Sequence, residues 1–290
     1  MVLHEAPATL VGVDEPQDYL ARRRRRWDVP LIVASGLTAL LMLVMAFPGF
    51  FAHGDPIALD PANGLLSPSS SHLFGTDEVG RDLYTRVIYG ARNSLGVTFV
   101  IVLPSAIFGV VYGAIAGWIG RWADAIMMRI VDIVLAFPIF ILAMAIAGVR
   151  GRGLSSVAIS LVLIWWPSYA RLVRGKFLTL RTTTYVEAAR ALGVSNRSII
   201  RRHLLPFVFD ELNVRLTSDI GYALVAVTSL SFLGVGAQSP TAEWGLLISD
   251  SRTYSLQAWW YLVFPGVTLV AATLIFTFLG DTIAARRKGR

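Results

Sequence analysis

The chain has 290 residues, of which 55% are hydrophobic and 16% are charged, and it contains no cysteine. A soluble domain of this length has too little interior to bury so much apolar surface, so the composition indicates a membrane protein. The lack of cysteine excludes disulfides, thiolate metal ligands and cysteine nucleophiles. The formal net charge of +7 at pH 7 would suit a nucleic-acid partner, but its distribution favours another explanation.

Six apolar segments are long enough, or nearly so, to cross a bilayer, whose core of about 30 Å needs about 20 helical residues. One of them, 133–149, is shorter and is expected to begin near Ala123. The first segment follows a long charged leader and precedes no small-x-small cleavage pattern, which favours a retained helix over a signal peptide. None of the six contains a charged residue, and the five longer ones are 31–50, 94–118, 154–170, 220–242 and 256–280.

The lysines and arginines predict the orientation of these segments, since short cationic loops stay on the cytoplasmic side. If the N-terminus is cytoplasmic, most of the 26 basic residues lie in the inner loops and tails. Both termini are therefore predicted to be cytoplasmic. The basic surplus is a topology signal and a contact for membrane lipid headgroups, and it needs no nucleic acid to explain it.

The outer segment between the first two spans is too long to be a simple connection. Residues 52–72 are rich in Pro, Gly and Ser, which predicts irregular structure. In 76–92, Thr76 can cap a helix that has one apolar face, formed by Val79, Leu83, Val87 and Ile88. This pattern predicts a short helix in the interface plane, and a docking site for an external partner is the alternative.

The cytoplasmic loop between the fourth and fifth spans has the signals of two short helices. Thr184 and Glu187 are spaced as a capping box, and Gly193 supplies a left-handed stop. Ser195 can cap the second helix. Pro206 falls in the first turn of the next span, where proline is tolerated. The loop is predicted to project from the membrane as a helix, a tight turn and a helix.

A helix-turn-helix of this kind is also typical of DNA-binding domains. The stretch between the flanking spans is too short to add the supporting core that such a domain needs, and the bilayer tethers both of its arms. A membrane-attached element is therefore the preferred interpretation.

The same loop resembles the EAA loop of ATP-binding-cassette importer permeases. The likeness is carried by EAARALG and HLLP, which supply Glu187, Ala188, Ala189, Gly193, His203, Leu204, Leu205 and Pro206. The general pattern has isoleucine where His203 stands, a departure typical of the peptide branch. Three segments are similar to the dipeptide and oligopeptide permease C subunits, namely 72–95, 129–138 and 231–245. Thr277 and the tail AARRKGR depart from that pattern.

The resemblance implies an all-α membrane protein with the type I importer permease fold and six transmembrane helices. It implies that the loop forms a coupling helix that seats on a cytoplasmic ATPase through Tyr185, Glu187, Ala188, Ala189, Gly193, His203 and Pro206. The implied partners are a second homologous permease, two ATPase domains, an extracytoplasmic substrate-binding protein and a peptide substrate. The implied location is the bacterial cytoplasmic membrane, and nickel chelates, glutathione and other small solutes are alternative substrates.

The chain is expected to divide at the membrane surfaces. The expected parts are a cytoplasmic tail (1–29), a first transmembrane helix (30–51), an extracytoplasmic loop with an interfacial helix (52–92), a five-helix core with its coupling loop (93–283, with 176–207) and a basic cytoplasmic tail (284–290).

The chain lacks the sequence of an ATP site. The only Gly-Lys pair, Gly175 and Lys176, precedes Phe177 and has Ala170 where a Walker loop has its first glycine. The histidines His4, His53, His72 and His203 are dispersed and show no metal or triad spacing. We therefore expect a transport subunit without a cofactor of its own, with ATP and Mg²⁺ bound by the partner ATPases.

Two pairs of charged residues are the remaining functional signal, because a charge in a span is costly unless it is paired. Arg129 with Asp132 and Arg215 with Asp219 have spacings at which a pair can neutralise itself on one helix face. They are predicted either to pair structurally near the interface or to line a translocation path or gate. An ion-coupled secondary carrier would need unpaired midplane carboxylates and an inverted repeat, and the sequence shows neither.

Overall fold

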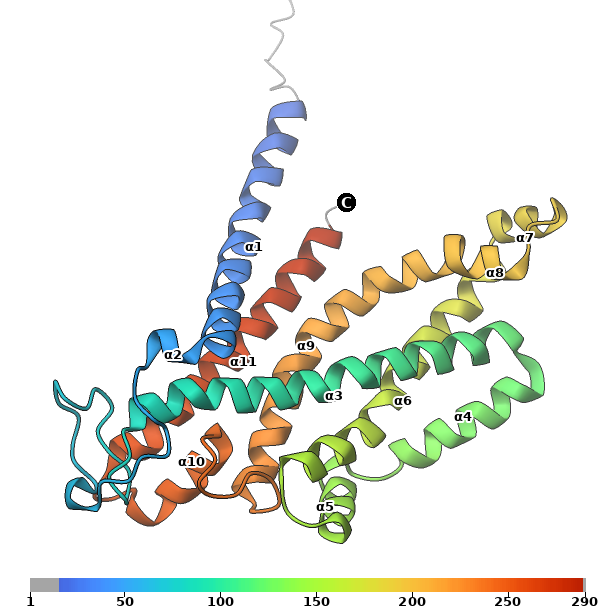
Figure 1. Cartoon of the computed structure of the whole chain (residues 1–290). Helices are drawn as coiled ribbons and strands as arrows, with labels where there is room; N and C mark the ends of the chain where they lie inside the picture. Colours follow the sequence, from blue (N-terminus) through green and yellow to red (C-terminus); the bar gives the residue numbers. More distant parts are fainter. Residues whose placement is uncertain (1–15, 289–290) are drawn as a thin grey trace, which may run out of the picture.

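The structure, a computed structural model, describes residues 16–288, which form a chain of helices without a regular sheet (Figure 1). In this part of the chain four helices are long and apolar enough to cross a membrane. A fifth crossing results if two helices that meet at 84° are counted as one broken span, α4 (Arg121–Leu135) and α5 (Ile139–Arg150). The four are α1 (Pro16–Ala46, its apolar part from Val29), α3 (Leu83–Ile119), α6 (Leu154–Leu180) and α11 (Trp259–Lys288).

The span expected at 220–242 has wrong boundaries at both ends. Its helix, α9 (Leu205–Phe232), begins much earlier and stops at Phe232, and residues 233–243 form a loop before α10 (Trp244–Ser251). Four charged residues fall between positions 210 and 219 of α9, and they lower its hydropathy below that of the four apolar helices. Hydropathy alone therefore identifies fewer than six spans in the described residues.

The first helix also differs from the expected range 30–51. It extends back at least to Pro16, so the described part of the expected tail 1–29 is helical, while residues 1–15 lie outside the described residues. Pro48 follows its end and opens the single turn α2 (Pro48–Phe51). Most of the apolar part of α1 is exposed in the isolated chain, as expected for a helix that faces lipid on most sides.

The separate interfacial helix predicted over 76–92 is absent from the described structure. Residues 76–82 form a turn closed by a β-bridge between Thr76 and Asp82, and Asp82, not Thr76, caps α3 by accepting from the Thr85 N–H at 2.8 Å. The apolar residues Leu83 and Val87 are buried in the first turns of α3. At 37 residues α3 is about 55 Å long, so it passes beyond a membrane core of about 30 Å.

Close packing of α3 against α6 forms the centre of the molecule. Gly109, Gly113 and Gly117 recur every fourth residue on the side of α3 that meets α6. A Cβ atom on Gly113 would lie 2.3 Å from the carbonyl oxygen of Ala170, so only glycine permits this approach. Small residues at such intervals allow two membrane helices to pack backbone to backbone.

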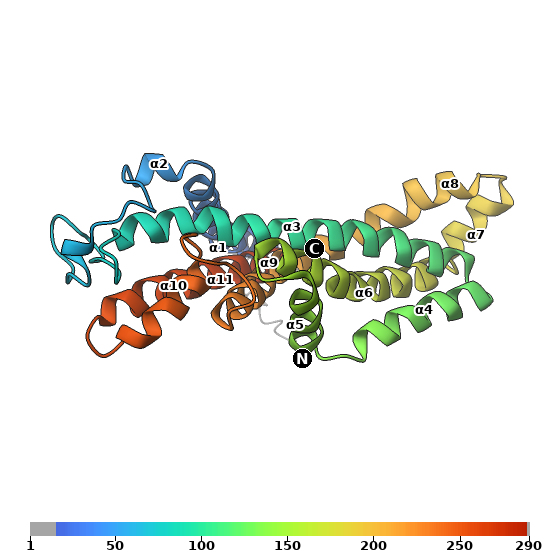
Figure 2. The same cartoon turned by 60° about the horizontal axis from the view of Figure 1, so that its bottom comes forward.

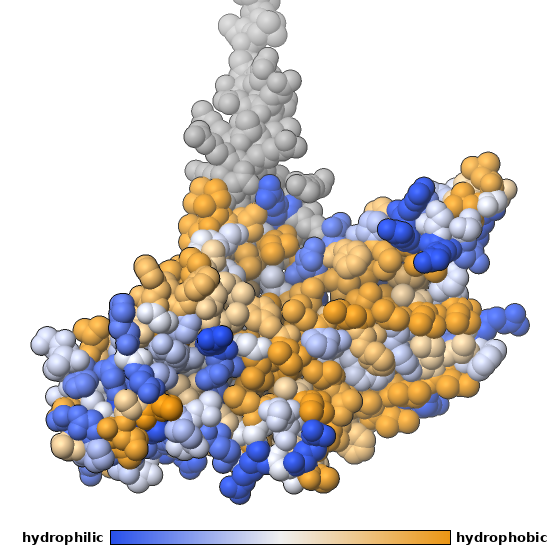
Figure 3. Space-filling model, in the orientation of Figure 1, coloured by the Kyte–Doolittle hydropathy of each residue, from blue (hydrophilic) through white to orange (hydrophobic). Residues whose placement is uncertain are grey.

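Polar segments lie at the two ends of α3, with apolar surface between them (Figures 1 and 3). One end holds the loop 52–82 with its short η1 turn (Pro61–Asn63), beside α10 and η3 (Arg252–Tyr254). The other end holds α7 (Thr184–Ala191) and α8 (Asn196–Ile199), and Figure 2 shows the same separation from another side. A π-helical stretch, η2 (Ile200–Leu204), joins α8 to α9.

Candidate coupling site and charged cavity

The N-cap of α7 lies one residue earlier than the sequence indicated. Thr183 is its N-cap, and the Thr183 hydroxyl donates to the Leu180 carbonyl at 2.6 Å instead of capping α7. Thr184 is already the first helical residue. The capping box predicted from Thr184 and Glu187 is therefore wrong, because a capping box needs its threonine outside the helix.

The turn between α7 and α8 has the predicted form. Gly193 has φ +76°, a left-handed conformation that favours glycine, and its N–H donates to the Arg190 carbonyl at 2.9 Å. The next N–H, of Val194, donates to Ala189 at 3.0 Å and closes the helix end. Ser195 caps α8 by accepting from the Ser198 N–H at 3.4 Å. Pro206 lies in the first turn of α9, as predicted.

The two helices present one face to the protein and one face to the outside. Val186 of α7 is fully buried in a cluster with Ile199, Leu204 and Phe177, which lies near the end of α6. Glu187 and Ala188 are exposed, and Leu192 is 83% exposed at the tip. Leu192 and the half-exposed Tyr185 are the large apolar side chains that α7 leaves available for contact with another protein. Sequence reasoning missed Leu192, and its only local signal is its position before the Gly193 stop.

Several contacts attach α7 to the ends of the membrane helices. The Arg190 guanidinium lies 5.0 Å from the ring centre of Trp118, at the end of α3. Arg181, the C-cap of α6 just before α7, donates to the Gly117 carbonyl of α3 at 3.1 Å. The Tyr185 hydroxyl donates to the His203 carbonyl in η2 at 3.4 Å. Movement of α7 would therefore act directly on α3 and on the start of α9.

The two predicted charged pairs have different outcomes. Arg215 donates from Nε to Asp219 Oδ2 at 2.9 Å, so this pair forms as expected. Asp132 instead accepts from Arg171 Nη2 of α6 at 2.6 Å, so the Arg129–Asp132 pair is wrong. The partner of Asp132 therefore comes from the facing helix α6 and not from α4 itself. The role of all four residues in a path or gate stays a prediction.

A second cross-link joins α4 to α6. Arg174 donates from Nε and Nη2 to the two carboxylate oxygens of Asp124, at 2.7 and 2.6 Å. A bidentate pair of this kind fixes orientation as well as distance. Together with the Arg171–Asp132 pair it ties α4 to α6, although α4 and α5 diverge after residue 135.

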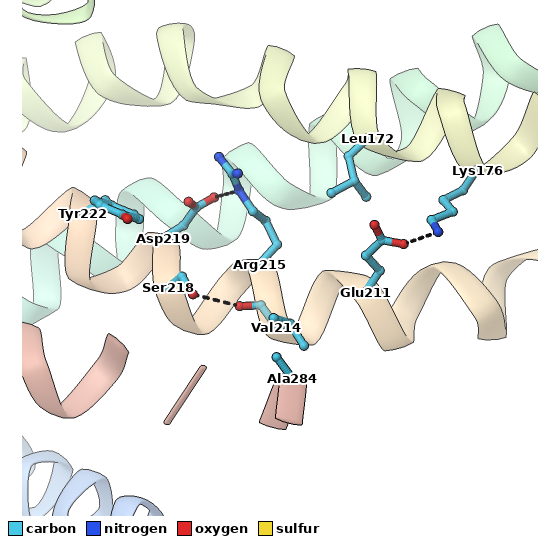
Figure 4. Close-up of a pocket in the computed structure, with 9 residues that line it drawn as sticks. All are labelled: Leu172, Lys176, Glu211, Val214, Arg215, Ser218, Asp219, Tyr222 and Ala284. Atoms are coloured by element: carbon cyan, nitrogen blue, oxygen red, sulfur yellow. Dashed lines mark hydrogen bonds and ion pairs between the residues drawn. The ribbon is translucent and has the colours of Figure 1, made fainter. Parts of the chain in front are cut away.

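The Arg215–Asp219 pair lies in a cavity of about 690 Å³ between α6, α9 and α11 (Figure 4). A second ion pair spans it from α6 to α9, with Lys176 Nζ 2.5 Å from Glu211 Oε2. The sequence predicted no pairing of Lys176 with Glu211, because the two residues are far apart along the chain. The cavity is lined by Leu172, Lys176, Glu211, Val214, Arg215, Ser218, Asp219, Tyr222 and Ala284.

Buried charges organise the opposite end of the molecule. Asp77 is fully buried and accepts from Arg81 Nε at 2.6 Å, and Arg86 Nε lies 3.4 Å from it. The Tyr261 hydroxyl of α11 donates to Glu78 at 2.6 Å. These contacts fasten the loop 52–82 to α3 and α11. The loop is therefore a folded part of the molecule.

Two carboxyl groups at this end have raised pKa values. Glu243 caps α10 by accepting from the Leu246 N–H at 2.9 Å, and burial raises its pKa. Burial, with the negative charge of Glu78 adding to it, raises the pKa of Asp250 to about 6. Both groups therefore hold a proton more strongly in the folded protein than in a solvated chain. Within residues 16–288, no three acidic, histidine or cysteine side chains are placed to hold a metal ion.

This combination of long membrane helices and a projecting helix-turn-helix matches a solved permease fold. A structure titled "Inward facing conformations of the MetNI methionine ABC transporter" aligns with a TM-score of 0.60 over 72% of this chain and 98% of that chain, at 22% identity. The class of fold is therefore the helical membrane fold of type I ABC importers.

Sequence comparison identifies the family. The family model described as "Binding-protein-dependent transport system inner membrane component" matches residues 109–289. The probable D,D-dipeptide transport system permease protein DdpC of Escherichia coli K12 is 41% identical over 88% of this chain and 86% of its own length. A putative peptide transport system permease protein of Brucella suis is 42% identical over 85% and 83%. The nickel transport system permease protein NikC of Escherichia coli K12 is 37% identical over 89% and 92%.

The chain therefore belongs to the binding-protein-dependent transport system inner membrane components. It is a permease subunit of an ABC importer and a multi-pass protein of the bacterial cytoplasmic membrane.

Proposed function

We propose that this permease imports di- or oligopeptides as one half of a permease heterodimer served by two ATPase domains and an extracytoplasmic binding protein. The substrate proposal is supported by the relatives that share 40–42% identity, whose names refer to dipeptide or peptide transport. Relatives named for glutathione and nickel transport share 36–37% identity, so these solutes are the second candidates.

The proposed topology has six spans with both termini in the cytoplasm. The broken pair α4 and α5 counts as one span and α9 as another, beside α1, α3, α6 and α11. The charge on α9 is compatible with a span because its ion pairs lie in a cavity lined by three helices and not in lipid. The basic α7–α8 loop then lies in the cytoplasm and the loop 52–82 lies outside.

The observation that carries the mechanism is the exposed tip of α7. Tyr185, Glu187, Ala188 and Leu192 face outward while Val186 holds the helix to the membrane domain. We propose that an ATPase binds this tip and that ATP-driven closure of the ATPase domains moves α7. The Arg190–Trp118 contact and η2 then pass the movement to α3 and α9, which opens the path alternately outward and inward.

Substitution of Leu192 by aspartate tests this proposal. We expect Leu192→Asp to lower peptide uptake by at least about tenfold, because burying an unpaired charge in a protein contact costs several kcal/mol. The assembled importer in vesicles is measured for peptide uptake and for ATPase stimulation by peptide-loaded binding protein. Leu73→Asp, which places the same charge at an exposed leucine of the loop 52–82, is the control. Normal coupling in Leu192→Asp would contradict an ATPase contact at this tip.

A further inference from the structure

The charges of the cavity between α6, α9 and α11 balance to zero. Its lining holds two cations, Lys176 and Arg215, and two carboxylates, Glu211 and Asp219. Its volume of about 690 Å³ lies within the range of small-molecule sites, roughly 300–1,000 Å³. Charged side chains at membrane depth usually face a water-filled cavity or pair with one another, and these four do both.

Arg215 is held so that part of its guanidinium is open to the cavity. Its bond to Asp219 uses Nε, and within the described residues neither Nη nitrogen donates a hydrogen bond. Asp219 is 1% exposed, whereas Arg215 is 46% exposed and its guanidinium points into the space before α6 (Figure 4). The buried carboxylate therefore fixes the guanidinium, and the open Nη pair can receive another carboxylate in bidentate form.

Glu211 lies one helical turn from Arg215 on the same helix. Its carboxylate meets Lys176 across the cavity and stays one-third exposed. Four residues along an α-helix rise about 6 Å, which is the spacing of the two backbone positions along the helix axis. The ammonium and carboxylate groups of an extended dipeptide are also about 6 Å apart, since one Cα–Cα step of about 3.8 Å is extended by one bond at each end.

We propose that this cavity binds a zwitterionic dipeptide in transit, with the peptide carboxylate on Arg215 and the peptide ammonium group on Glu211. The inference rests on the proposed peptide import and specifies which form of the peptide this subunit recognises. The match of spacing, the open guanidinium and the partly exposed carboxylate carry it together.

Charge balance gives the site its selectivity. A zwitterion enters a neutral cavity and leaves it neutral, so each of its charges meets an opposite one. A peptide blocked by N-acetylation is an anion, and a peptide amide is a cation. Either one gives the occupied cavity a net charge of −1 or +1, whereas the zwitterion keeps it neutral, and a net charge between membrane helices is costly.

Equilibrium binding of radiolabelled alanyl-alanine to the whole importer tests the proposal. The nucleotide-free complex is placed in phosphatidylglycerol nanodiscs without the binding protein, so that only the membrane subunits can hold the peptide. We expect saturable binding that unlabelled alanyl-alanine displaces at least tenfold better than N-acetyl-alanyl-alanine or alanyl-alanine amide does.

Two variants assign the two ends of the peptide. Glu211→Gln is expected to remove the preference over the N-acetyl peptide and keep the preference over the amide. Arg215→Lys keeps the positive charge but cannot form a bidentate pair with a carboxylate, so it is expected to weaken the preference over the amide. The control is Asp210→Asn, at the exposed neighbour of Glu211 that does not line the cavity. Complex assembly and ATPase stimulation by loaded binding protein check that each variant is folded.

The outcomes separate this inference from the proposed function. If the wild-type importer takes up alanyl-alanine but shows no saturable binding, or binds all three peptides equally, the site inference is overturned and peptide import stands. Loss of binding on adding phosphatidylethanolamine would assign the cavity to a zwitterionic lipid headgroup and would also overturn it. Absence of peptide uptake by an assembled, ATP-hydrolysing complex would overturn both.

Discussion

At the scale of single residues, the projecting loop depends on one backbone conformation. Gly193 is left-handed, yet no atom lies within 4 Å of the place where its Cβ would stand. The constraint is therefore conformational and not steric. A residue other than glycine pays roughly 1–2 kcal/mol there, and asparagine tolerates the conformation best.

We expect Gly193→Val to reduce peptide uptake and ATPase coupling by at least about tenfold while membrane insertion stays normal, because a β-branched residue strongly disfavours positive φ and displaces the α7 tip. Uptake in vesicles and insertion by fractionation are the measurements. Gly193→Asn should retain most of the activity. Equal activity of the valine and asparagine variants would show that the left-handed turn is unimportant.

The raised pKa of Asp250 predicts a pH dependence of stability at the end of the molecule that holds α10. The folded value of about 6 exceeds the ordinary value of 3.8, so the folded state binds the proton more tightly. Stability should fall as pH rises from about 4 to about 6 and change little above that range. Asp250→Asn should remove this decrease of stability with pH. The measurement is amide hydrogen exchange of α10 at about pH 5 and pH 7.5. An unchanged pH dependence of stability in this variant would show that Asp250 is not its source.

At the scale of elements, the contact between α3 and α6 decides whether the core assembles. Their glycine stripe brings the two backbones together over about two helical turns. Asp124 and Arg174 then tie α4 to α6. A side chain inserted in the stripe must push α6 away. Overpacking of this kind usually costs about 1–3 kcal/mol.

Gly113→Val is expected to lower the melting temperature of the purified complex by several degrees and to reduce its yield, since its side chain meets the backbone of Ala170. Gly96→Ala is the matched control on the same helix, where no atom lies within 4 Å of the added Cβ. The control should be neutral or slightly stabilising. A similar loss in both variants would indicate a general effect of removing glycine from α3.

At the scale of the whole molecule, two polar regions lie at opposite ends of α3. One end is the folded loop 52–82 with α10, and the other is the α7–α8 projection. A chain without cysteine allows the sidedness of these ends to be read directly from introduced thiols.

Single cysteines at two exposed positions test the proposed topology. Leu256→Cys, next to η3, should react with a membrane-impermeant maleimide in intact cells. Asn196→Cys, at the start of α8, should react only after the membrane is opened. Labelling in the reverse order would place the coupling loop outside and would overturn the proposed mechanism.

Local patterns in the sequence were sufficient for the features that depend on near neighbours. Apolar segments indicated most of the membrane helices, Gly193 and Ser195 predicted the turn and cap of the projection, and four-residue spacing predicted the Arg215–Asp219 pair. The resemblance of the EAA-like loop led to the right family. These features are encoded within one or two helical turns, where periodicity, capping and charge spacing act.

Only the tertiary structure decided the features whose partners are distant in the chain. Asp132 pairs with Arg171 instead of Arg129, and Lys176 reaches Glu211 across a cavity that requires three helices. The full length of α9 could not be predicted from hydropathy, because its charged residues lower the hydropathy of the helix. Their ion pairs involve α9 itself and the neighbouring helix α6. Sequence by itself therefore determined where helices and turns form, and packing decided which charges meet, because contact between helices depends on their arrangement in space.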